Sequence, residues 1–165
     1  MTNKERAFMV AKKAHSNQTY DIYPYEYHVQ QVAKIAEELG YDESIVISAF
    51  LHDTIEDTDL SYNDIKTAFG VEVAEIVYCV TDELGRNRKE RKEKTYPKIR
   101  SNWKAVAVKI CDRIANIQQS ILYQPNKLKM YQKEHKDFYE NVHSKDHPEN
   151  ELNKAWNKLN EILKL

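Results

Sequence analysis

Glycine and proline are scarce in this sequence, with three and four residues respectively among 165. Both residue types interrupt or weaken helices, so their scarcity favours long, uninterrupted helices. The sequence also has no internal repeat. A chain of this length can form one domain with a sizeable core, and we expect residues 1–165 to form a single domain.

Cysteine, charge of one sign and long apolar runs are also scarce. The two cysteines, Cys79 and Cys111, form no zinc-type cluster and fit a reduced cytoplasmic protein better than a disulfide scaffold. A net charge of −1 gives no indication of a nucleic-acid or membrane partner. No apolar run approaches the ~20 residues of a membrane span, and the first residues lack a signal-peptide core. We therefore expect a cytoplasmic protein with neither kind of partner.

The sequence contains an apolar stretch that is followed directly by a histidine and several acidic residues. Residues 45–51 are apolar at all but one position, which is typical of a buried helix. His52, Asp53, Glu56 and Asp57 then follow within six positions. Such groups at the end of a buried helix are costly unless something compensates them, as a divalent metal would. On a continuing helix, His52 would share a face with Glu56, and Asp53 with Asp57.

The alternative is a solvated acidic helix end, although carboxylates near a helix C-terminus oppose the helix dipole. The spacing of two histidines favours the metal. His28 lies 12 residues before Gly40, and His52 lies 12 residues after it. If two antiparallel helices meet at Gly40, each covers ~18 Å over those residues. We therefore expect the two histidines to lie level at the open end of this hairpin.

A further candidate, Asp112, lies in the middle of an otherwise apolar predicted helix. Aspartate is rarely buried without a partner. One explanation is a salt bridge with Lys109 or Arg113, and the other is a role as an oxygen ligand. Asn116 is four residues further and shares its face, and Gln119 lies one turn beyond. This polar stripe would suit the wall of a ligand-binding site.

Other segments are assigned from their apolar spacing and capping residues. Further helices are predicted over residues 3–16, 25–39, 61–69, 71–84, 103–119, 127–141 and 148–165. The basic run Arg86–Lys94 is interpreted as a solvated, mobile loop or helix start, or alternatively as a cationic flap that closes over phosphates. Tyr20 belongs to a tyrosine-rich loop, where it could cover the core or stack on a base.

Several motifs follow one another in a fixed order. They are His28, Leu51-His-Asp-Thr-Ile-Glu-Asp-Thr58, the helix break at Phe69-Gly70, Val80-Thr81 and Lys109-Ile-Cys-Asp-Arg-Ile-Ala-Asn116. Together they resemble the HD superfamily of metal-dependent phosphohydrolases. The pattern is more similar still to the hydrolase domain of the RelA/SpoT alarmone enzymes and their small single-domain relatives. The resemblance covers roughly residues 7–119.

That resemblance implies an all-α helical bundle of the HD-domain type, with residues 127–165 packed on the motif-bearing core. It also implies one Mn²⁺ ion per chain. The implied metal ligands are His28, His52, Asp53 and Asp112. The implied catalytic residues, which would handle the water and its protons, are Glu56 and Asp57. The implied substrate contacts are Asn116 and Gln119, and we add Tyr20 and Lys109 as candidate substrate contacts. The family's reaction removes pyrophosphate from the 3′ position of guanosine tetra- or pentaphosphate.

One segment departs from the family pattern. Nine to seven residues before the first metal histidine, the alarmone hydrolases carry an Arg-Lys-Ser segment that packs on the guanine and its phosphates. Here those positions are Thr19-Tyr20-Asp21, although Pro24 and Tyr25 keep the pattern. Val29 also replaces the proline that usually follows the histidine, which affects the helix start more than the chemistry. The cationic clamp is therefore missing, and the substrate is less well specified than the metal site.

Three functions remain open from the sequence. The first is a guanosine-3′,5′-bis(diphosphate) 3′-pyrophosphohydrolase-like enzyme. The second is a phosphatase of the same type that acts on another nucleotide or a phosphorylated dinucleotide. The third is a sensor that binds nucleotide or metal without turnover. Glu56 and Asp57 argue against the sensor, because a pure binder does not need them. The sequence carries no indication of oligomeric state.

Overall fold

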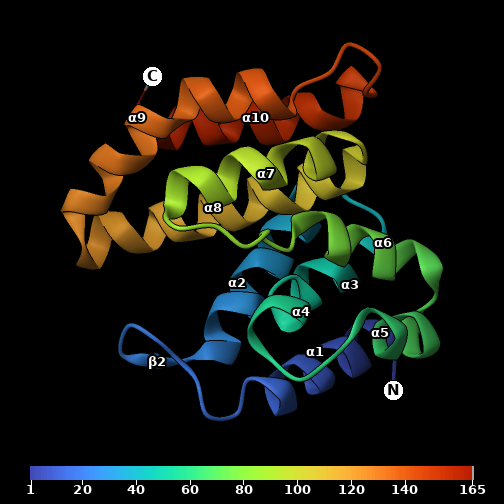
Figure 1. Cartoon of the computed structure of the whole chain (residues 1–165). Coiled ribbons are helices and arrows are strands. Elements are labelled where there is room, and N and C mark those ends of the chain that lie inside the picture. Colours follow the sequence, from blue (N-terminus) through green and yellow to red (C-terminus); the bar gives the residue numbers. More distant parts are fainter. Residues whose placement is uncertain (165) are drawn as a thin grey trace.

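The structure, a computed structural model, describes residues 1–164 and is all-α apart from one short hairpin (Figure 1). The hairpin pairs β1 (Thr19–Tyr20) with β2 (Tyr23–Pro24) antiparallel. The helices are α1 (Asn3–Ala14), α2 (Tyr25–Glu38), α3 (Glu43–Leu51), α4 (Thr54–Asp57), α5 (Tyr62–Phe69), α6 (Val71–Val80), α7 (Arg88–Arg100), α8 (Trp103–Tyr123), α9 (Pro125–Val142) and α10 (Glu149–Leu163). The predicted fold class is confirmed.

Local signals in the sequence explain where these helices begin and end. Ser61 opens α5 with a capping box, in which its side chain accepts from the Asp64 amide and Asp64 accepts in return. Asp42 caps α3 by accepting from the amide of Ile45 at 3.1 Å. Gly40 follows α2 with a φ of 80°, a left-handed conformation that glycine adopts without a steric penalty. This turn lets α2 and α3 run back against each other.

Two apolar clusters hold the helices together. The larger surrounds α8 and takes side chains from α2, α3, α6, α7, α9 and α10. The smaller lies among α1, α2, α3, α5 and α6. In Figure 1, α7 to α10 lie together at the top and α1, α4 and α5 at the bottom. Helices α2 and α3 contribute to both clusters, so their polar ends face the space between the two groups. Within residues 1–164, no helix combines the length and apolar composition needed to cross a membrane.

The helix expected to continue through the acidic stretch is broken instead. Helix α3 ends at Leu51, His52 and Asp53 form a turn, and α4 begins at Thr54. Asp53 has a φ of −100° and a ψ of 2°, outside the helical range. The buried Thr54 hydroxyl donates to the Leu51 carbonyl at 2.7 Å, which satisfies an acceptor freed by the break. The prediction that His52 and Asp53 share continuous helix faces with Glu56 and Asp57 is therefore wrong.

Other boundaries also differ from the prediction. Helix α6 stops at Val80 rather than at residue 84, because Thr81 is extended. Helix α8 continues to Tyr123 rather than stopping at residue 119. The basic run is a helix start rather than a mobile loop, since Asn87 caps α7 by accepting from the amide of Glu90 at 2.9 Å. The cations of this run therefore have fixed positions on α7.

Replacing Thr54 by valine should destabilise the fold, because it leaves the Leu51 carbonyl at the helix break without its partner. Thr54 is fully buried, and an unsatisfied buried acceptor costs about 1–3 kcal/mol. Urea unfolding should show this loss, whereas the control Thr67→Val, at an exposed position of α5, should stay within about 0.5 kcal/mol of the parent. Equal stability of the two variants would contradict this account of the break.

Candidate metal centre and active site

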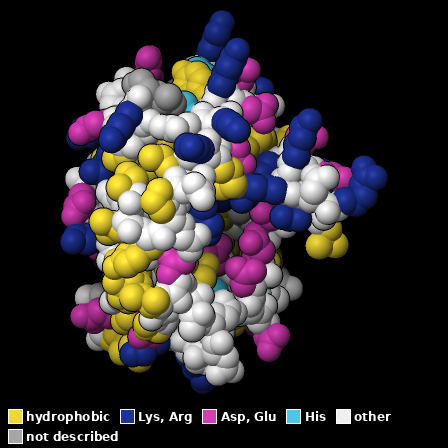
Figure 2. Space-filling model, turned by 90° about the vertical axis from the view of Figure 1, so that its left-hand side faces the viewer, with side chains coloured by type: hydrophobic (Ala, Val, Ile, Leu, Met, Phe, Trp, Pro, Cys, Tyr) yellow, Lys and Arg dark blue, Asp and Glu magenta, His cyan; other side chains and the backbone are white. Residues whose placement is uncertain are grey.

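Acidic side chains gather around a hollow on one face of the molecule, with Lys and Arg side chains beside them (Figure 2). A cavity of about 210 Å³ is lined by both kinds of residue, and we call it the metal cavity. Its carboxyl groups belong to Asp53, Glu56, Asp57, Asp82 and Asp112. Its cationic groups belong to Arg88, Lys92, Lys109 and Arg113. Both signs of charge are therefore concentrated in one small space.

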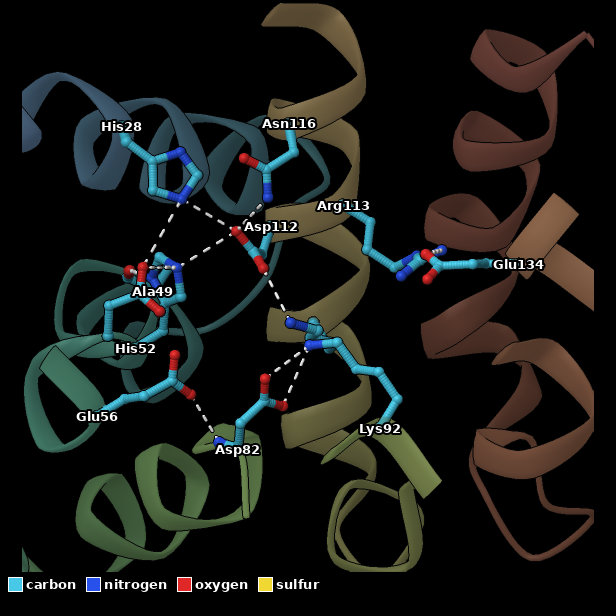
Figure 3. A network of polar contacts seen from close by, with 12 residues as sticks. His28, Ala49, His52, Glu56, Asp82, Lys92, Asp112, Arg113, Asn116 and Glu134 are labelled. Carbon is cyan, nitrogen blue, oxygen red and sulfur yellow. Dashed lines mark hydrogen bonds and ion pairs between the residues drawn. The ribbon is translucent and has the colours of Figure 1, made fainter. Parts of the chain in front are cut away.

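The four predicted metal ligands come together from three elements, with His28, Asp53 and Asp112 lining this cavity and His52 buried behind them. Figure 3 shows His28, His52 and Asp112 pointing toward one another. His28 lies on α2, His52 and Asp53 in the turn after α3, and Asp112 on α8. The Asp112 Oδ1 atom lies 3.0 Å from His28 Nε2 and 3.3 Å from His52 Nε2. The Asp53 Oδ2 atom lies 3.0 Å from His52 Nε2 and 3.9 Å from His28 Nε2. The two imidazole rings are 5.2 Å apart, so the expected level placement of the histidines is confirmed.

The orientation of His52 fits a metal ligand. Its Nδ1 lies 2.7 Å from the carbonyl oxygen of Ala49, so Nδ1 carries the proton and donates. This tautomer leaves a lone pair on Nε2. That atom is buried and has no hydrogen-bond partner, although carboxylate oxygens of Asp53 and Asp112 lie within ion-pair distance. Such a lone pair is repelled by the two carboxylates, so in the metal-free protein Nε2 carries a second proton, which a metal ion would displace. The residues present therefore suit a divalent ion.

The charge of the four side chains supports the same conclusion. Burial alone would raise the pKa of Asp112, but Lys109 and His52 hold that pKa well below its usual range. Burial also acts against ionisation of Asp53, and His52 outweighs it, so the pKa of Asp53 is lowered. Both carboxyl groups are thus ionised. Once a metal ion displaces the proton of His52, two carboxylates and two neutral imidazoles would give mixed oxygen and nitrogen ligation with a formal charge that a divalent cation balances.

A second layer of contacts holds these side chains in place. Tyr25 donates its hydroxyl hydrogen to Asp53 Oδ2. Lys109 Nζ lies 3.1 Å from Asp112 Oδ2, and the Asn116 amide donates to Asp112 Oδ1 at 3.0 Å. The salt bridge considered as an alternative for Asp112 is therefore present alongside its approach to the histidines. Tyr25 was not among the predicted site residues, and its position three residues before His28 on one face of α2 is the signal that could have identified it.

Glu56 and Asp57 lie next to the ligand cluster on α4. Carboxylate oxygens of Asp53, Glu56 and Asp57 lie within 4.8 Å of one another. Burial, and then the charge of Asp53, raise the pKa values of both Glu56 and Asp57. Glu56 Oε1 accepts from the backbone amide of Asp82 at 2.7 Å, which fixes its direction. A carboxyl group with a raised pKa that faces the cavity is suited to proton transfer.

The basic run contributes a wall of the metal cavity, which the sequence did not specify. Lys92 is buried and donates to both carboxylate oxygens of Asp82, at 2.9 and 3.1 Å. Burial and the nearby Lys109 lower the pKa of Lys92 to about 8. Arg88 pairs with Glu134 on α9 at 2.7 Å. Two cations of the basic run, Arg88 and Lys92, line the cavity, and closure of this segment over phosphates stays a prediction.

The predicted substrate contacts divide between two neighbouring spaces. Tyr20 stacks on His28 with ring centroids 4.5 Å apart and donates to Asn116 Oδ1 at 2.6 Å. Asn116 lines the metal cavity, but Gln119 does not. Gln119 lines an adjoining cavity of about 190 Å³ beneath the β-hairpin, where it donates to Asp21 at 3.0 Å. We call this second space the hairpin cavity. Lys109 is held by Asp112.

A protein-family model described as an HD domain matches residues 7–146. The chain belongs to the HD domain family. Its extent as a single domain over residues 1–165 remains a prediction, because the match ends before α10.

Relatives with curated names agree with this assignment. An Aquifex aeolicus protein named guanosine-3′,5′-bis(diphosphate) 3′-pyrophosphohydrolase is 34% identical over 141 residues, which cover 82% of this chain and 20% of that protein. The Drosophila melanogaster protein of that name, MESH1, is 35% identical over 98 residues, or 58% of this chain and 55% of that one. This HD chain thus spans about a fifth of the length of the bacterial relative.

A solved structure has the same fold. It is described as a metazoan ortholog of SpoT that hydrolyses ppGpp and plays a role in starvation responses. The TM-score is 0.80 at 24% sequence identity, and the match covers 99% of this chain and 95% of that one. The arrangement of helices around the metal cavity is therefore that of the HD-type hydrolase fold.

Removing His52 or Asp112 should abolish metal binding, because each side chain faces the shared centre of the cluster. We expect His52→Ala and Asp112→Ala to be isolated without the divalent metal that the parent retains, as measured by elemental analysis of dialysed protein. The control His143→Ala lies in the loop before α10 and should keep the metal. Full metal occupancy in both cavity variants would refute the assignment.

Metal binding should also be coupled to pH. Burial lowers the pKa of His52, but Asp53 and Asp112 outweigh this effect. The pKa of His52 in the metal-free protein therefore lies well above 6.5. A proton on Nε2 excludes a metal there, so metal affinity should fall as the pH falls below that pKa, by up to about tenfold per pH unit for one displaced proton. Calorimetry in buffers of different ionisation enthalpy at pH 7 should show proton release on binding. Binding without proton release would contradict the assigned protonation state.

Proposed function

We propose that the chain is a Mn²⁺-dependent phosphohydrolase of nucleotides, most similar in activity to a guanosine-3′,5′-bis(diphosphate) 3′-pyrophosphohydrolase. The observation that supports this most strongly is the buried cluster of two histidines and two carboxylates beside Glu56 and Asp57. A sensor that only binds its ligand has no need for two further carboxyl groups with raised pKa values at this point. The names of the curated relatives supply the nucleotide class.

The proposed metal ligands are His28, His52, Asp53 and Asp112. Mixed nitrogen and oxygen ligation is compatible with Mn²⁺. A bound divalent ion would polarise a phosphoryl oxygen and lower the pKa of a water ligand. The chain's own contribution is to orient the ligands: Ala49 sets the tautomer of His52, and Tyr25 sets the position of Asp53. Lys109 and Asn116 hold Asp112 in the same way.

Glu56 and Asp57 are proposed to move protons. Each carboxyl group is close to Asp53 but is not among the four proposed ligands. Because burial and Asp53 raise their pKa values, one can accept a proton from the attacking water while the other donates to the leaving oxygen. The backbone amide of Asp82 keeps Glu56 pointed along the cavity wall.

The cations of the metal cavity are proposed to bind the phosphates. With five carboxylates and four cationic groups, the cavity has a formal charge of −1, which becomes +1 when a divalent ion is bound. An anionic substrate is therefore favoured only after the metal binds. Arg88 and Lys92 on α7 are the cations available here, whereas the family's clamp on the β-hairpin is absent. Charge-assisted hydrogen bonds from such groups are about twice as strong as neutral ones.

A second candidate substrate is another phosphorylated nucleotide, including a phosphorylated dinucleotide. The sequence Thr19-Tyr20-Asp21 favours it, because this hairpin lacks the cations expected for the most highly charged substrate. A cytoplasmic location also remains a prediction from cysteine content.

Neutralising either acidic residue of α4 should remove turnover without removing the metal. Glu56→Gln and Asp57→Asn keep the size of each side chain but not its proton chemistry, so kcat should fall roughly 10²-fold or more. Metal content and unfolding midpoint should stay at parental values. The matched control Asp59→Asn, at an exposed position just after α4, should keep full activity. Parental rates in both cavity variants would rule out the proposed roles.

The substrate can be decided by measuring pyrophosphate and phosphate release, with Mn²⁺, from a panel of phosphorylated nucleotides and dinucleotides. We expect guanosine tetraphosphate to be cleaved at the 3′ position, with a KM that rises with ionic strength because cations bind its phosphates. Turnover of another compound with the tetraphosphate untouched would support the second candidate. Nucleotide binding without any turnover would support the sensor.

A further inference from the structure

The hairpin cavity adjoins the metal cavity and shares three of its walls. Tyr20, Asn116 and Tyr131 line both spaces. At about 190 and 210 Å³ the two cavities together fall within the roughly 300–1,000 Å³ of ligand pockets. Tyr20 also connects them by contact, since its ring stacks on His28 and its hydroxyl donates to Asn116. A nucleotide with its phosphoryl group at the metal cavity can therefore place its base in the hairpin cavity.

Asp21 is an exposed residue whose carboxylate lines the hairpin cavity, as does the side chain of Lys127. It is the first residue of the two-residue turn between β1 and β2, and its φ of 53° is rare for a residue other than glycine. Gln119 donates to one carboxylate oxygen at 3.0 Å, and Gln124 donates to the other. Gln119 is itself 6% exposed. The carboxylate is thus fixed by two amides, although the turn would form with less strain with glycine at this position.

A carboxylate held in one position can distinguish nucleobases by the hydrogen-bond donors that each base presents to it. An ionised carboxylate only accepts, and its two oxygens offer about four lone-pair sites. The two glutamines occupy one site on each oxygen, which leaves one further site on each. Guanine presents two adjacent donors, the N1–H and the 2-amino group. Hypoxanthine presents only the first of these. Adenine presents an acceptor at N1, which a carboxylate repels.

We propose that Asp21 is a specificity-determining residue whose carboxylate accepts from both donors of a guanine base. This inference rests on the proposed function, in that it names the base of the substrate bound at the same site. Hydrogen bonds from the base to Asp21 would take the place of the cationic contacts that this hairpin lacks. The hairpin would recognise the base, and the cations of α7 would bind the phosphates.

Equilibrium binding tests the proposal independently of turnover. The probes are guanosine, inosine, adenosine and xanthosine 5′-diphosphates, titrated calorimetrically into the Mn²⁺-loaded chain. We expect guanosine diphosphate to bind about tenfold or more tightly than the inosine compound, as the loss of one hydrogen bond to a charged group predicts. Adenosine diphosphate should bind more weakly still.

The variant Asp21→Asn should reduce the guanosine-to-inosine ratio to about one. Its amide can donate to the 2-oxo group of xanthine, so xanthosine diphosphate should gain affinity. Asparagine also tolerates a positive φ, so the turn is retained. The matched control Glu26→Gln removes the same charge from the nearby first turn of α2, where Glu26 pairs with Lys12, and should keep the parental ratio.

Equal affinity of the parent for guanosine and inosine diphosphates, an unchanged ratio in Asp21→Asn, or no measurable binding of any probe would overturn the role of Asp21. A preserved guanine preference in a chain that hydrolyses nothing would instead overturn the proposed hydrolase activity and leave the base recognition standing.

Discussion

Two ionised carboxylates, Asp53 and Asp112, face the same buried space, and the rest of the site compensates for that arrangement. Buried charges of one sign repel each other and lose hydration, so they persist only with partners. Lys109 offsets one of the carboxylates and Tyr25 hydrogen bonds to the other. Nε2 of His52, which has no hydrogen-bond partner within the described residues, lies between the two carboxylates and carries a proton in the metal-free protein. The fold thus concentrates negative charge at a buried point, and a divalent cation would balance it.

The helices that carry the proposed metal ligands could largely be predicted from the sequence. Apolar spacing identifies α2 and α8, and Gly40 identifies the turn that pairs α2 with α3. Equal spacing from that turn brings His28 and His52 together. The periodicity of apolar residues and the spacing from the turn are local properties of the sequence. They suffice here because α2 and α3 are regular helices. Asp112 is identified for the same reason, as a charge in an apolar stripe.

What could not be predicted depends on contacts between distant residues. The break after Leu51 follows from the side-chain hydrogen bond of Thr54 and from packing, neither of which has a periodic signal. The basic run looks like a solvated segment until α9 supplies Glu134 as a partner for Arg88. Gln119 does not line the metal cavity, and it donates to Asp21, nearly a hundred residues away. These features determine the substrate, whereas the regular helices determine the metal site.

The distribution of charge around the ligand cluster also bears on the orientation of the proposed substrate. Cations of α7 and α8 line the metal cavity, and the carboxylate of Asp21 lines the hairpin cavity together with Lys127. A molecule with an anionic end and a hydrogen-bond donor end matches this polarity in one orientation only. In the reverse orientation its phosphates would meet Asp21 and its base would meet Arg88 and Lys92. Because like charges at short range are repulsive, the proposed nucleotide would bind in the orientation that keeps its phosphates away from Asp21.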